Sequence, residues 1–520
     1  MRKGILKKIA ALGLAVATTL SMGVTALAAD DVAVNGPKNG HTYEVYQVFT
    51  GDVDAKNNFA NARYGTVAEL PEGKKVGQAV VNTTLKDLQN VASSTDDRAK
   101  LDKILEYVDQ TKLVTKYATA TVDDTNATAN VAPGYYLIKD KDGSIPTDDK
   151  KADAYTLYLV KIVGSAITIE PKSEVPTVEK EVKEDSNNAW QKYADAEIGQ
   201  LVDFKLTGSL PKDYANYKYY TYVFEDSFTN MAFKARSVKV TLGKSGKDIT
   251  DLFTVDANNE TGKLTVSCNN LKANALTKDL ATDDTIVVTY QAALTSAAVV
   301  GNPGNPNKVD LVYSNNPNVD ANGDKNTTDK TPEKEVLVFT YELDTTKYDA
   351  NTNEELDGAK FVLKNSDGQF AILNDEGKLT GWADTEGDAT VLVSQKDVPM
   401  KVVGLDSTDV YTLVEKEAPN GGYRKLDKDI TITITSKIET SVKKIAEITD
   451  IDAEVGAPAK LIDEETDYNT GKVAIDVPNT KESNLPTTGG MGTRLFYIIG
   501  GVLMAGAAIA LVAKKKMNRV

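Results

Sequence analysis

The sequence predicts an all-β protein built from tandem β-sandwich domains, and three observations support this fold class. Short runs of alternating apolar and polar residues recur along the chain, as in the Ile-Thr repeats of 430–435, and such alternation is typical of half-buried strands. The 36 glycines and many Asn/Asp-rich turns separate these runs at short intervals, which favours Ig-like sandwiches. The length of 520 residues is enough for three or four domains, each with its own core.

The first 28 residues have the layout of a secretory signal peptide. Four basic residues precede or flank the start of the apolar run 9–20, and the small residues of 26–28 (Ala-Leu-Ala) offer a cleavage site. We therefore expect residues 1–28 to be absent from the mature, exported chain.

The C-terminal end combines three features in a fixed order. Residues 495–513 carry no charge and are long enough to span a bilayer as a helix, and the basic tail 514–520 is expected on the cytoplasmic side. Directly before the span lies the sequence Leu485-Pro486-Thr487-Thr488-Gly489. A single-pass anchor with a chance Pro-Gly turn is the simpler interpretation, but the whole order resembles the cell-wall sorting signal of Gram-positive surface proteins. The resemblance implies that a sortase cysteine cleaves after Thr488 and holds that residue as a thioester.

Composition excludes several classes of function. One cysteine, Cys268, and one histidine, His41, exclude a disulfide framework and zinc sites rich in Cys or His. The formal charge is −15, and because the two ends carry nine basic and no acidic residues, the region between them stands at −24. Such an acidic body is a poor binder of nucleic acid or anionic membranes. We expect no metal and no cofactor; the segment 320–331 has calcium-loop spacing, but Lys325 and Thr331 break the pattern and favour a polar linker.

Two polar, proline-bearing stretches suggest the domain boundaries. The stretches 171–176 and 316–335 divide the exported chain into a first domain (29–173), a middle domain (174–330) and a third domain (331–482). Within the first, residues 96–108 place apolar side chains at helical spacing, which predicts one helix.

Two lysines stand inside apolar rows of predicted strands. In 177–183, Lys180 shares a face with Val178 and Val182, and Lys347 ends the inward row of the strand 337–347. A buried ammonium costs several kcal/mol unless it is paired or neutralised. These two lysines therefore call for partners, although snorkelling from a strand end would explain either one alone.

Matching rows contain a carboxyl and a terminal asparagine. Asp226 follows Tyr222 and Phe224 on one face, and Glu415 follows Tyr411 and Leu413. The last strand of the third domain carries Asn479; that of the middle domain carries Asn307, with Asn315 on the same face as the alternative. A lone inward polar residue is usually a satisfied core group, but the order Lys, acid, Asn occurs twice.

These three residue types permit a Lys–Asn isopeptide bond. Desolvation lowers the pKa of a lysine and raises that of a carboxyl, so a neutral amine can coexist with a protonated acid. The amine then attacks the asparagine amide, the carboxyl moves protons, and ammonia leaves. We predict the bonds Lys180–Asn307, assisted by Asp226, and Lys347–Asn479, assisted by Glu415; each reaction occurs once, so the chain is not a turnover enzyme.

Several motifs resemble those of the SpaA-type backbone pilins of Gram-positive bacteria. Segments 176–182 and 313–317 are similar to their middle domain, which is of the collagen-adhesin A type. Segments 356–363 and 411–423 are similar to their collagen-adhesin B-type domain, and 40–49 resembles the start of their N-terminal domain. The resemblance implies that Glu415 is the family's E-box acid and Asn479 its terminal asparagine.

A pilin of this kind needs one exposed lysine to resolve the sortase thioester. In 167–172 the alternation places Lys172 opposite the isoleucines, at the junction of the first two domains, and the Pro171-Lys172 pair is similar to the family's pilin motif. Glu170 stands where that motif usually has an aromatic residue, and a linker lysine is by default merely solvated.

The sequence therefore predicts a secreted major pilin, covalently anchored to the cell wall and joined head to tail through Thr488 and Lys172. The resemblance implies as partners a class C pilus sortase, further copies of the chain, tip and base minor pilins, and peptidoglycan through a housekeeping sortase, with a host receptor as a further candidate. The alternatives are a wall-anchored adhesin or minor pilin, since loop binding surfaces leave little trace in sequence, and a secreted enzyme, for which no nucleophile–base set is visible.

Overall fold

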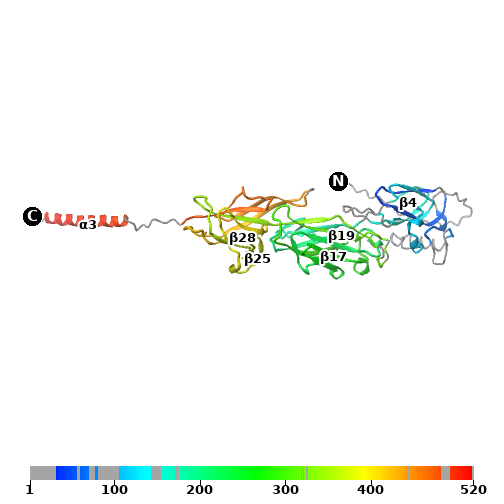
Figure 1. Cartoon of the computed structure of the whole chain (residues 1–520), viewed down its shortest axis with the longest axis horizontal. Coiled ribbons are helices and arrows are strands. Elements are labelled where there is room, and N and C mark those ends of the chain that lie inside the picture. Colours follow the sequence, from blue (N-terminus) through cyan, green and yellow to red (C-terminus); the bar gives the residue numbers. More distant parts are fainter. Residues whose placement is uncertain are drawn as a thin grey trace. The chain divides into compact units, whose positions relative to one another are not determined.

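The computed structural model describes residues 31–54, 59–68, 77–79, 105–141, 144, 154–169, 175–317, 319, 321–323, 326–441, 444–481 and 492–517. The predicted fold class is confirmed, because the described chain consists mostly of β-sheets and has an apolar helix at its C-terminal end (Figure 1). The chain divides into two compact units: the first comprises residues up to 299 together with 303–339 and 440–447, and the second comprises 300–302, 340–439 and 448 onward. The first unit holds residues of both the first and the middle predicted domains, so the three-domain division stays a prediction.

Two sheets form from residues 32–168. The larger has the order β3-β2-β6-β7, with β4 pairing β2, and the smaller has the order β5-β1-β8. The strands are β1 (Val32–Asn35), β2 (Tyr43–Val53), β3 (Phe59–Tyr64), β4 (Ala120–Val122), β5 (Thr128–Val131), β6 (Gly134–Asp140), β7 (Leu157–Ile162) and β8 (Ile167–Thr168).

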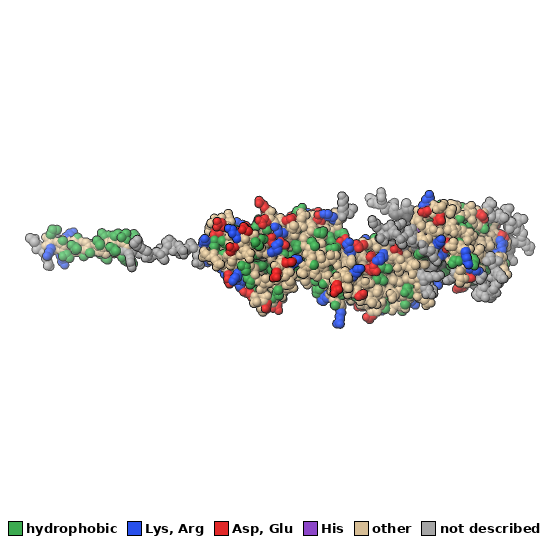
Figure 2. Space-filling view, in the orientation of Figure 1, with side chains coloured by type: hydrophobic (Ala, Val, Ile, Leu, Met, Phe, Trp, Pro, Cys, Tyr) green, Lys and Arg blue, Asp and Glu red, His purple; other side chains and the backbone are tan. Residues whose placement is uncertain are grey.

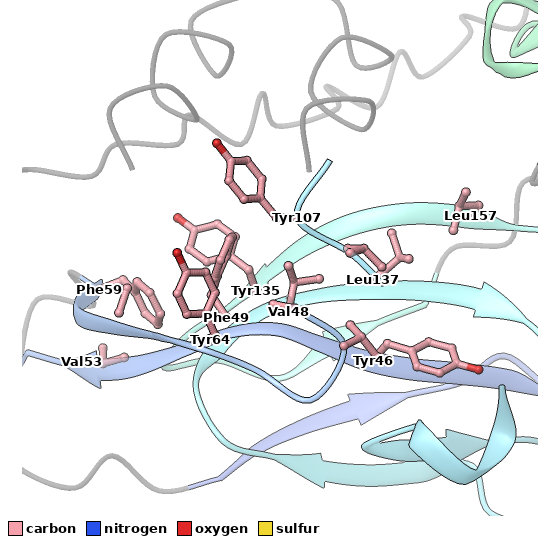
Figure 3. Close-up of a cluster of buried hydrophobic side chains, with 14 residues drawn as sticks. Tyr46, Val48, Phe49, Val53, Phe59, Tyr64, Tyr107, Tyr135, Leu137 and Leu157 are labelled. Atoms are coloured by element: carbon pink, nitrogen blue, oxygen red, sulfur yellow. The ribbon is translucent and has the colours of Figure 1, made fainter. Parts of the chain in front are cut away.

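Strand β6 is buried along its whole length, since apolar clusters cover both faces of the larger sheet. On one face, shown in Figure 3, aromatic rings pack edge to face, as between Phe59 and Tyr135 with ring centroids 5.2 Å apart. On the other face Tyr136 and Ile138 pack against the smaller sheet's valines. The predicted helix 96–108 lies mostly outside the described residues.

Residues 178–339 form a sandwich of two sheets. One has the order β10-β9-β12-β18-β14, with β15 pairing β18, and the other has the order β11-β21-β19-β13-β17-β16, with β20 pairing β19. The first sheet contains β9 (Val178–Lys183), β10 (Trp190–Gln191), β12 (Leu201–Ser209), β14 (Met231–Phe233), β15 (Lys239–Leu242) and β18 (Thr285–Leu294). The second contains β11 (Tyr193–Asp195), β13 (Tyr222–Phe228), β16 (Thr254–Asn258), β17 (Lys263–Cys268), β19 (Asn305–Ser314), β20 (Thr328–Lys330) and β21 (Lys334–Phe339).

The second unit is built on two further sheets, with orders β27-β22-β32-β31 and β25-β24-β23-β28-β29-β30, with β26 pairing β23. The first contains β22 (Tyr341–Asp349), β27 (Met400–Leu405), β31 (Lys460–Leu461) and β32 (Lys472–Asn479). The second contains β23 (Lys360–Lys364), β24 (Phe370–Leu373), β25 (Leu379–Ala383), β26 (Leu392–Val393), β28 (Val410–Glu417), β29 (Ile430–Glu439) and β30 (Glu447–Val455). Strands β22 and β32 run parallel as direct neighbours, which places the start of this domain beside its end.

The C-terminal helix α3 (Gly492–Met517) carries the predicted membrane span. Its segment 495–517 is long and apolar enough to cross a bilayer, and its apolar side chains are exposed along the helix (Figure 2). The basic residues 514–516 of the predicted tail lie in its last turn. The signal peptide 1–28, the sorting motif 485–489 and Lys172 lie outside the described residues.

Candidate functional site: two buried clusters of lysine, acid and asparagine

The first cluster begins with Lys180 on β9. Burial alternates along this strand, so Lys180 is fully buried while Glu179 is exposed and pairs with Lys192 (Nζ–Oε2 3.0 Å). The inward ammonium lies over the rings of Phe204 and Tyr290, at 5.7 and 5.5 Å from their centroids. Apolar alternation on β9 and its neighbour β12 thus holds one charged group inside an aromatic core.

A carboxyl from the opposite sheet meets this lysine. Lys180 Nζ donates a hydrogen bond to Asp226 Oδ2, and Asp226 is almost fully buried on β13. Lys180 Nζ also donates to the Tyr290 hydroxyl at 3.1 Å, and that hydroxyl donates to Asp226 Oδ1 at 3.0 Å. The amine, the carboxyl and the phenol therefore form a closed ring of hydrogen bonds.

Asn307 on β19 completes the cluster. Its Nδ2 donates to the Tyr290 hydroxyl at 2.8 Å, and among the described residues nothing hydrogen-bonds to its buried Oδ1. The alternative partner, Asn315, lies eight residues further along the chain, where its Oδ1 accepts from Thr327 Oγ1 at 2.7 Å. Eight residues of strand correspond to about 26 Å. The structure therefore places Asn307 on the Tyr290 hydroxyl that also binds Lys180, and leaves Asn315 far along the chain from this cluster.

Burial sets the protonation of this cluster. Desolvation lowers the pKa of Lys180 and raises the pKa of Asp226, while their mutual attraction opposes both shifts. Burial also raises the pKa of Tyr290 well above its usual range, so its hydroxyl keeps its proton. Moving one proton from the amine to the carboxyl gives the neutral pair that nucleophilic attack requires.

The second cluster lies between neighbouring strands of one sheet. The parallel register sets Lys347 opposite Val477 and Asp349 opposite Asn479, so Lys347 and Asn479 share a face two positions apart. Lys347 Nζ donates to Asn479 Oδ1 and to the carbonyl of Val477 at 2.9 Å. The amine therefore contacts the side-chain amide directly, with no residue between them.

Glu415 on β28 approaches from the other sheet. Its Oε1 accepts from Asn479 Nδ2 at 3.1 Å and lies 3.8 Å from Lys347 Nζ, while its Oε2 accepts from the backbone N–H of Leu426 at 2.6 Å. The carbonyl of Arg424 accepts the second Asn479 Nδ2 hydrogen at 2.8 Å. All three residues of this cluster are 2% exposed, and burial lowers the pKa of Lys347 to about 8, so part of this amine is neutral near neutral pH.

Both clusters present the groups that amide exchange requires. Each holds an amine of lowered pKa, a side-chain amide and a carboxyl that can move protons; these groups contact one another in the second cluster and are connected through the Tyr290 hydroxyl in the first. Folding holds these groups in one buried cluster, which raises their effective concentration by many orders of magnitude over free reactants. The arrangement can therefore form a Lys–Asn amide with release of ammonia.

Two further groups were not found from the sequence. Tyr290 belongs to an ordinary inward row on β18, and nothing in that row separates a tyrosine in a site from one in a core. Lys139 on β6 is buried beside Glu44, with Nζ–Oε2 at 3.9 Å, in a strand whose complete burial removes the alternation that would have indicated an inward lysine. The antiparallel pairing of β2 with β6 sets Glu44 opposite Lys139.

Comparisons with known proteins agree with parts of this architecture. Residues 341–447 match the SpaA family described as a prealbumin-like fold domain, and residues 477–519 match the LPXTG cell wall anchor motif. The chain is 24% identical over 397 residues to the trypsin-resistant surface T6 protein of Streptococcus pyogenes serotype M6, covering 66% of this chain and 70% of that protein.

Solved structures with similar chains include three pilins. The pilus 2b backbone protein of group B streptococcus is 26% identical, with a TM-score of 0.40 over 60% of this chain and 99% of that one. The T6 backbone pilin of serotype M6 Streptococcus pyogenes is 16% identical, with a TM-score of 0.48 over 87% and 98% of the two chains. The major pilin SpaD of Corynebacterium diphtheriae is 16% identical, with a TM-score of 0.44 over 88% and 99%.

Proposed function

We propose that this chain, a sortase-assembled major pilin anchored to the Gram-positive cell wall, builds a pilus shaft held by two kinds of amide bond. One kind closes inside two of its sandwiches, between Lys180 and Asn307 and between Lys347 and Asn479. The other joins Thr488 of one copy to Lys172 of the next. The observation that best supports the proposal is the pair of buried clusters, which hold a desolvated amine and a side-chain amide in direct contact in the second cluster and on one shared hydroxyl in the first.

The internal reaction starts with a proton shift from the lysine ammonium to the carboxylate. The neutral Nζ then attacks the asparagine Cγ and a new C–N bond forms. The carboxyl gives its proton to the departing nitrogen as the old C–N bond breaks, and the attacking nitrogen gives one proton back to the carboxylate. One ammonia leaves for each amide formed. Because the carboxyl is not consumed but the lysine and asparagine are, each site reacts once, and the protein is a sortase substrate rather than a turnover enzyme.

The bonds would tie the first strand of a sandwich to its last. The loop closed between Lys347 and Asn479 spans 132 positions, for which the chain-entropy estimate made for disulfides gives roughly 5 kcal/mol. The mechanical consequence is larger, since tension entering on β22 leaves on β32 through a covalent bridge without peeling either strand from its sheet. A shaft subunit under load would benefit from such a path.

The intersubunit bond accounts for the sorting signal. A pilus sortase would hold Thr488 as a thioester, and the amine of Lys172 on the next copy would resolve it, which makes other copies of the chain the principal partner. Tip and base minor pilins, transfer to peptidoglycan by a housekeeping sortase, and any host receptor belong to the same proposal.

The intersubunit bond is tested in the native host with Lys172→Ala. High-molecular-weight ladders of the chain should disappear, while monomer stays attached to the wall. The matched control is Lys263→Ala, an exposed lysine on β17 with no assigned role, which should keep the ladders. Persistent ladders in Lys172→Ala would overturn the assignment of this lysine, and a wild-type chain displayed only as monomer would instead favour a wall-anchored adhesin.

A further inference from the structure

The hydroxyl of Tyr290 contacts every reacting group of the first cluster, which is formed by Lys180, Asp226 and Asn307. It lies 3.1 Å from Lys180 Nζ, 3.0 Å from Asp226 Oδ1 and 2.8 Å from Asn307 Nδ2. A phenol has one hydrogen to donate and two lone pairs to accept with. All three are in use, because the hydroxyl donates to Asp226 and accepts from the other two groups.

Asp226 reaches Asn307 only through this hydroxyl in the described contacts. Both oxygens of Asp226 are occupied, Oδ2 by Lys180 and Oδ1 by Tyr290. In the second cluster the corresponding step needs no intermediary, since Glu415 Oε1 itself accepts from Asn479 Nδ2 at 3.1 Å. The two clusters therefore differ in how the carboxyl is connected to the leaving nitrogen.

We propose that Tyr290 is a catalytic residue of the first cluster, relaying the proton of Asp226 to the amide nitrogen that leaves Asn307. The inference rests on the proposed Lys180–Asn307 bond and deepens it by assigning the route of the proton.

The relay balances as follows. Lys180 gives one proton to Asp226, and its neutral Nζ attacks Asn307 Cγ. Once Asp226 is protonated, its carboxyl donates to the Tyr290 oxygen, and the Tyr290 hydrogen turns from Asp226 to Nδ2, which reverses both hydrogen bonds of the resting cluster. Asp226 then gives its proton to the Tyr290 oxygen while the Tyr290 hydrogen passes to Nδ2, the Cγ–Nδ2 bond breaks, and ammonia leaves. A further proton from the attacking nitrogen returns to Asp226, so Tyr290 ends the reaction as a phenol, as it began.

The surroundings of Tyr290 suit a relay rather than a phenolate. Its ring stacks on Phe204, with centroids 5.3 Å apart and planes 15° apart, and the register sets these residues opposite each other on β18 and β12. This stacking fixes the hydroxyl between the two sheets. The fully buried ring also favours a neutral group that receives one proton as it gives another.

The test is Tyr290→Phe in the full exported chain, with each bond followed separately by mass spectrometry of its cross-linked peptide. Wild type should carry the Lys180–Asn307 link at the first time point after purification in the cold. Tyr290→Phe should carry it in a minor fraction that grows on incubation, at a rate lower by roughly 10²-fold or more, the usual loss when one acid–base group is removed. The Lys347–Asn479 link of the same molecules should be complete.

The matched control is Tyr222→Phe. Tyr222 is equally buried in the same sandwich, and its hydroxyl donates to the Ser209 carbonyl at 2.8 Å without touching a reacting group. It should link at the wild-type rate. Complete early linking in Tyr290→Phe, or equal slowing in both variants, would overturn the relay.

A fluorinated tyrosine at position 290 covers the case in which Tyr290→Phe does not fold. It keeps the ring and the hydroxyl but makes the hydroxyl more acidic, so a relay predicts a changed linking rate and pH dependence, and an unchanged profile would overturn it. A wild-type chain that never forms the Lys180–Asn307 link would contradict the proposed function itself, which separates the two failures.

Discussion

The two clusters contain the same residue types, yet the carboxyl lies against the amine in one and against the amide in the other. Asp226 binds Lys180, and Tyr290 connects them to Asn307; Glu415 binds Asn479, which Lys347 already contacts. The cause lies in the strands. β9 and β19 belong to opposing sheets, which pack about 10 Å apart, whereas β22 and β32 are neighbours within one sheet.

The placement of the strands, rather than the residue types, therefore determines which side chains of such a site hydrogen-bond to one another. Between the two sheets, the described contacts join Lys180 and Asn307 through the hydroxyl of Tyr290 on a third strand, β18. Within one sheet the parallel register brings the amine of Lys347 and the amide of Asn479 together on one face, where Glu415 contacts them from the other sheet. Substitutions in and outside the two clusters should therefore differ in their effects on stability.

The largest effect is expected from removing the carboxyl of each cluster. Asp226→Ala leaves the fully buried Lys180 without its anionic partner and without its link, so the free energy of unfolding of that sandwich should fall by roughly 5 kcal/mol or more. Glu415→Ala leaves Lys347 with the Val477 carbonyl and Asn479, so its loss should be smaller. Denaturant unfolding and protease resistance measure the two losses. A loss in Glu415→Ala equal to or larger than that in Asp226→Ala would contradict the proposed difference between the clusters.

A pH dependence should appear in an unlinked second cluster. In Glu415→Gln we expect Lys347 to stay an amine whose folded pKa lies at or below about 8, against 10.5 when unfolded, because burial disfavours its charge. Between these values the unfolded chain binds more protons, so stability should rise with pH by about 3 kcal/mol or more across the whole interval and stay flat below the folded pKa.

The control for that prediction is wild type, in which Lys347 is an amide nitrogen and does not titrate. Denaturant midpoints compared at pH 7.5 and pH 9.5 should rise in Glu415→Gln by more than in wild type. Equal changes in the two proteins would contradict the prediction, because Lys347 would then be linked in both or a free amine in both.

The smallest effect is expected at an exposed lysine. Lys330 pairs with Glu225 and Asp310 on the outer face of the middle sandwich, and its side chain is 52% exposed. Lys330→Ala should change the free energy of unfolding by less than about 1 kcal/mol, because solvent screens such pairs, and both links should form. A loss comparable with that of Asp226→Ala would remove the distinction between inward and outward lysines.

The sequence predicted which residues form the two clusters better than it predicted the hydrogen bonds among them. Period-two alternation marks an inward residue wherever one face is polar, and it therefore found Lys180, Lys347 and both carboxyls. It could not separate Asn307 from Asn315, since residues eight apart share a face, and only the pairing of β19 with β13 places Asn307 beside Phe228 and near Asp226. Tyr290 was missed because its role depends on contacts between sheets, which no local pattern encodes.

Secondary structure could likewise be predicted from sequence only where burial alternates. Burial alternates along β9 and β18, whereas β6 is buried on both faces and shows no alternation. The parallel pairing of β22 with β32 joins residues more than a hundred positions apart, and hydrophobic periodicity carries no information about such partners.

The intact mass of the exported chain, purified without any sortase, tests the central claim most directly. Two internal amides each release one ammonia, so the account predicts a mass about 34 Da below that of the unmodified chain, and about 17 Da below it for Asp226→Ala or Glu415→Ala, each compared with its own sequence. A wild-type mass equal to that of its unmodified sequence would contradict the account.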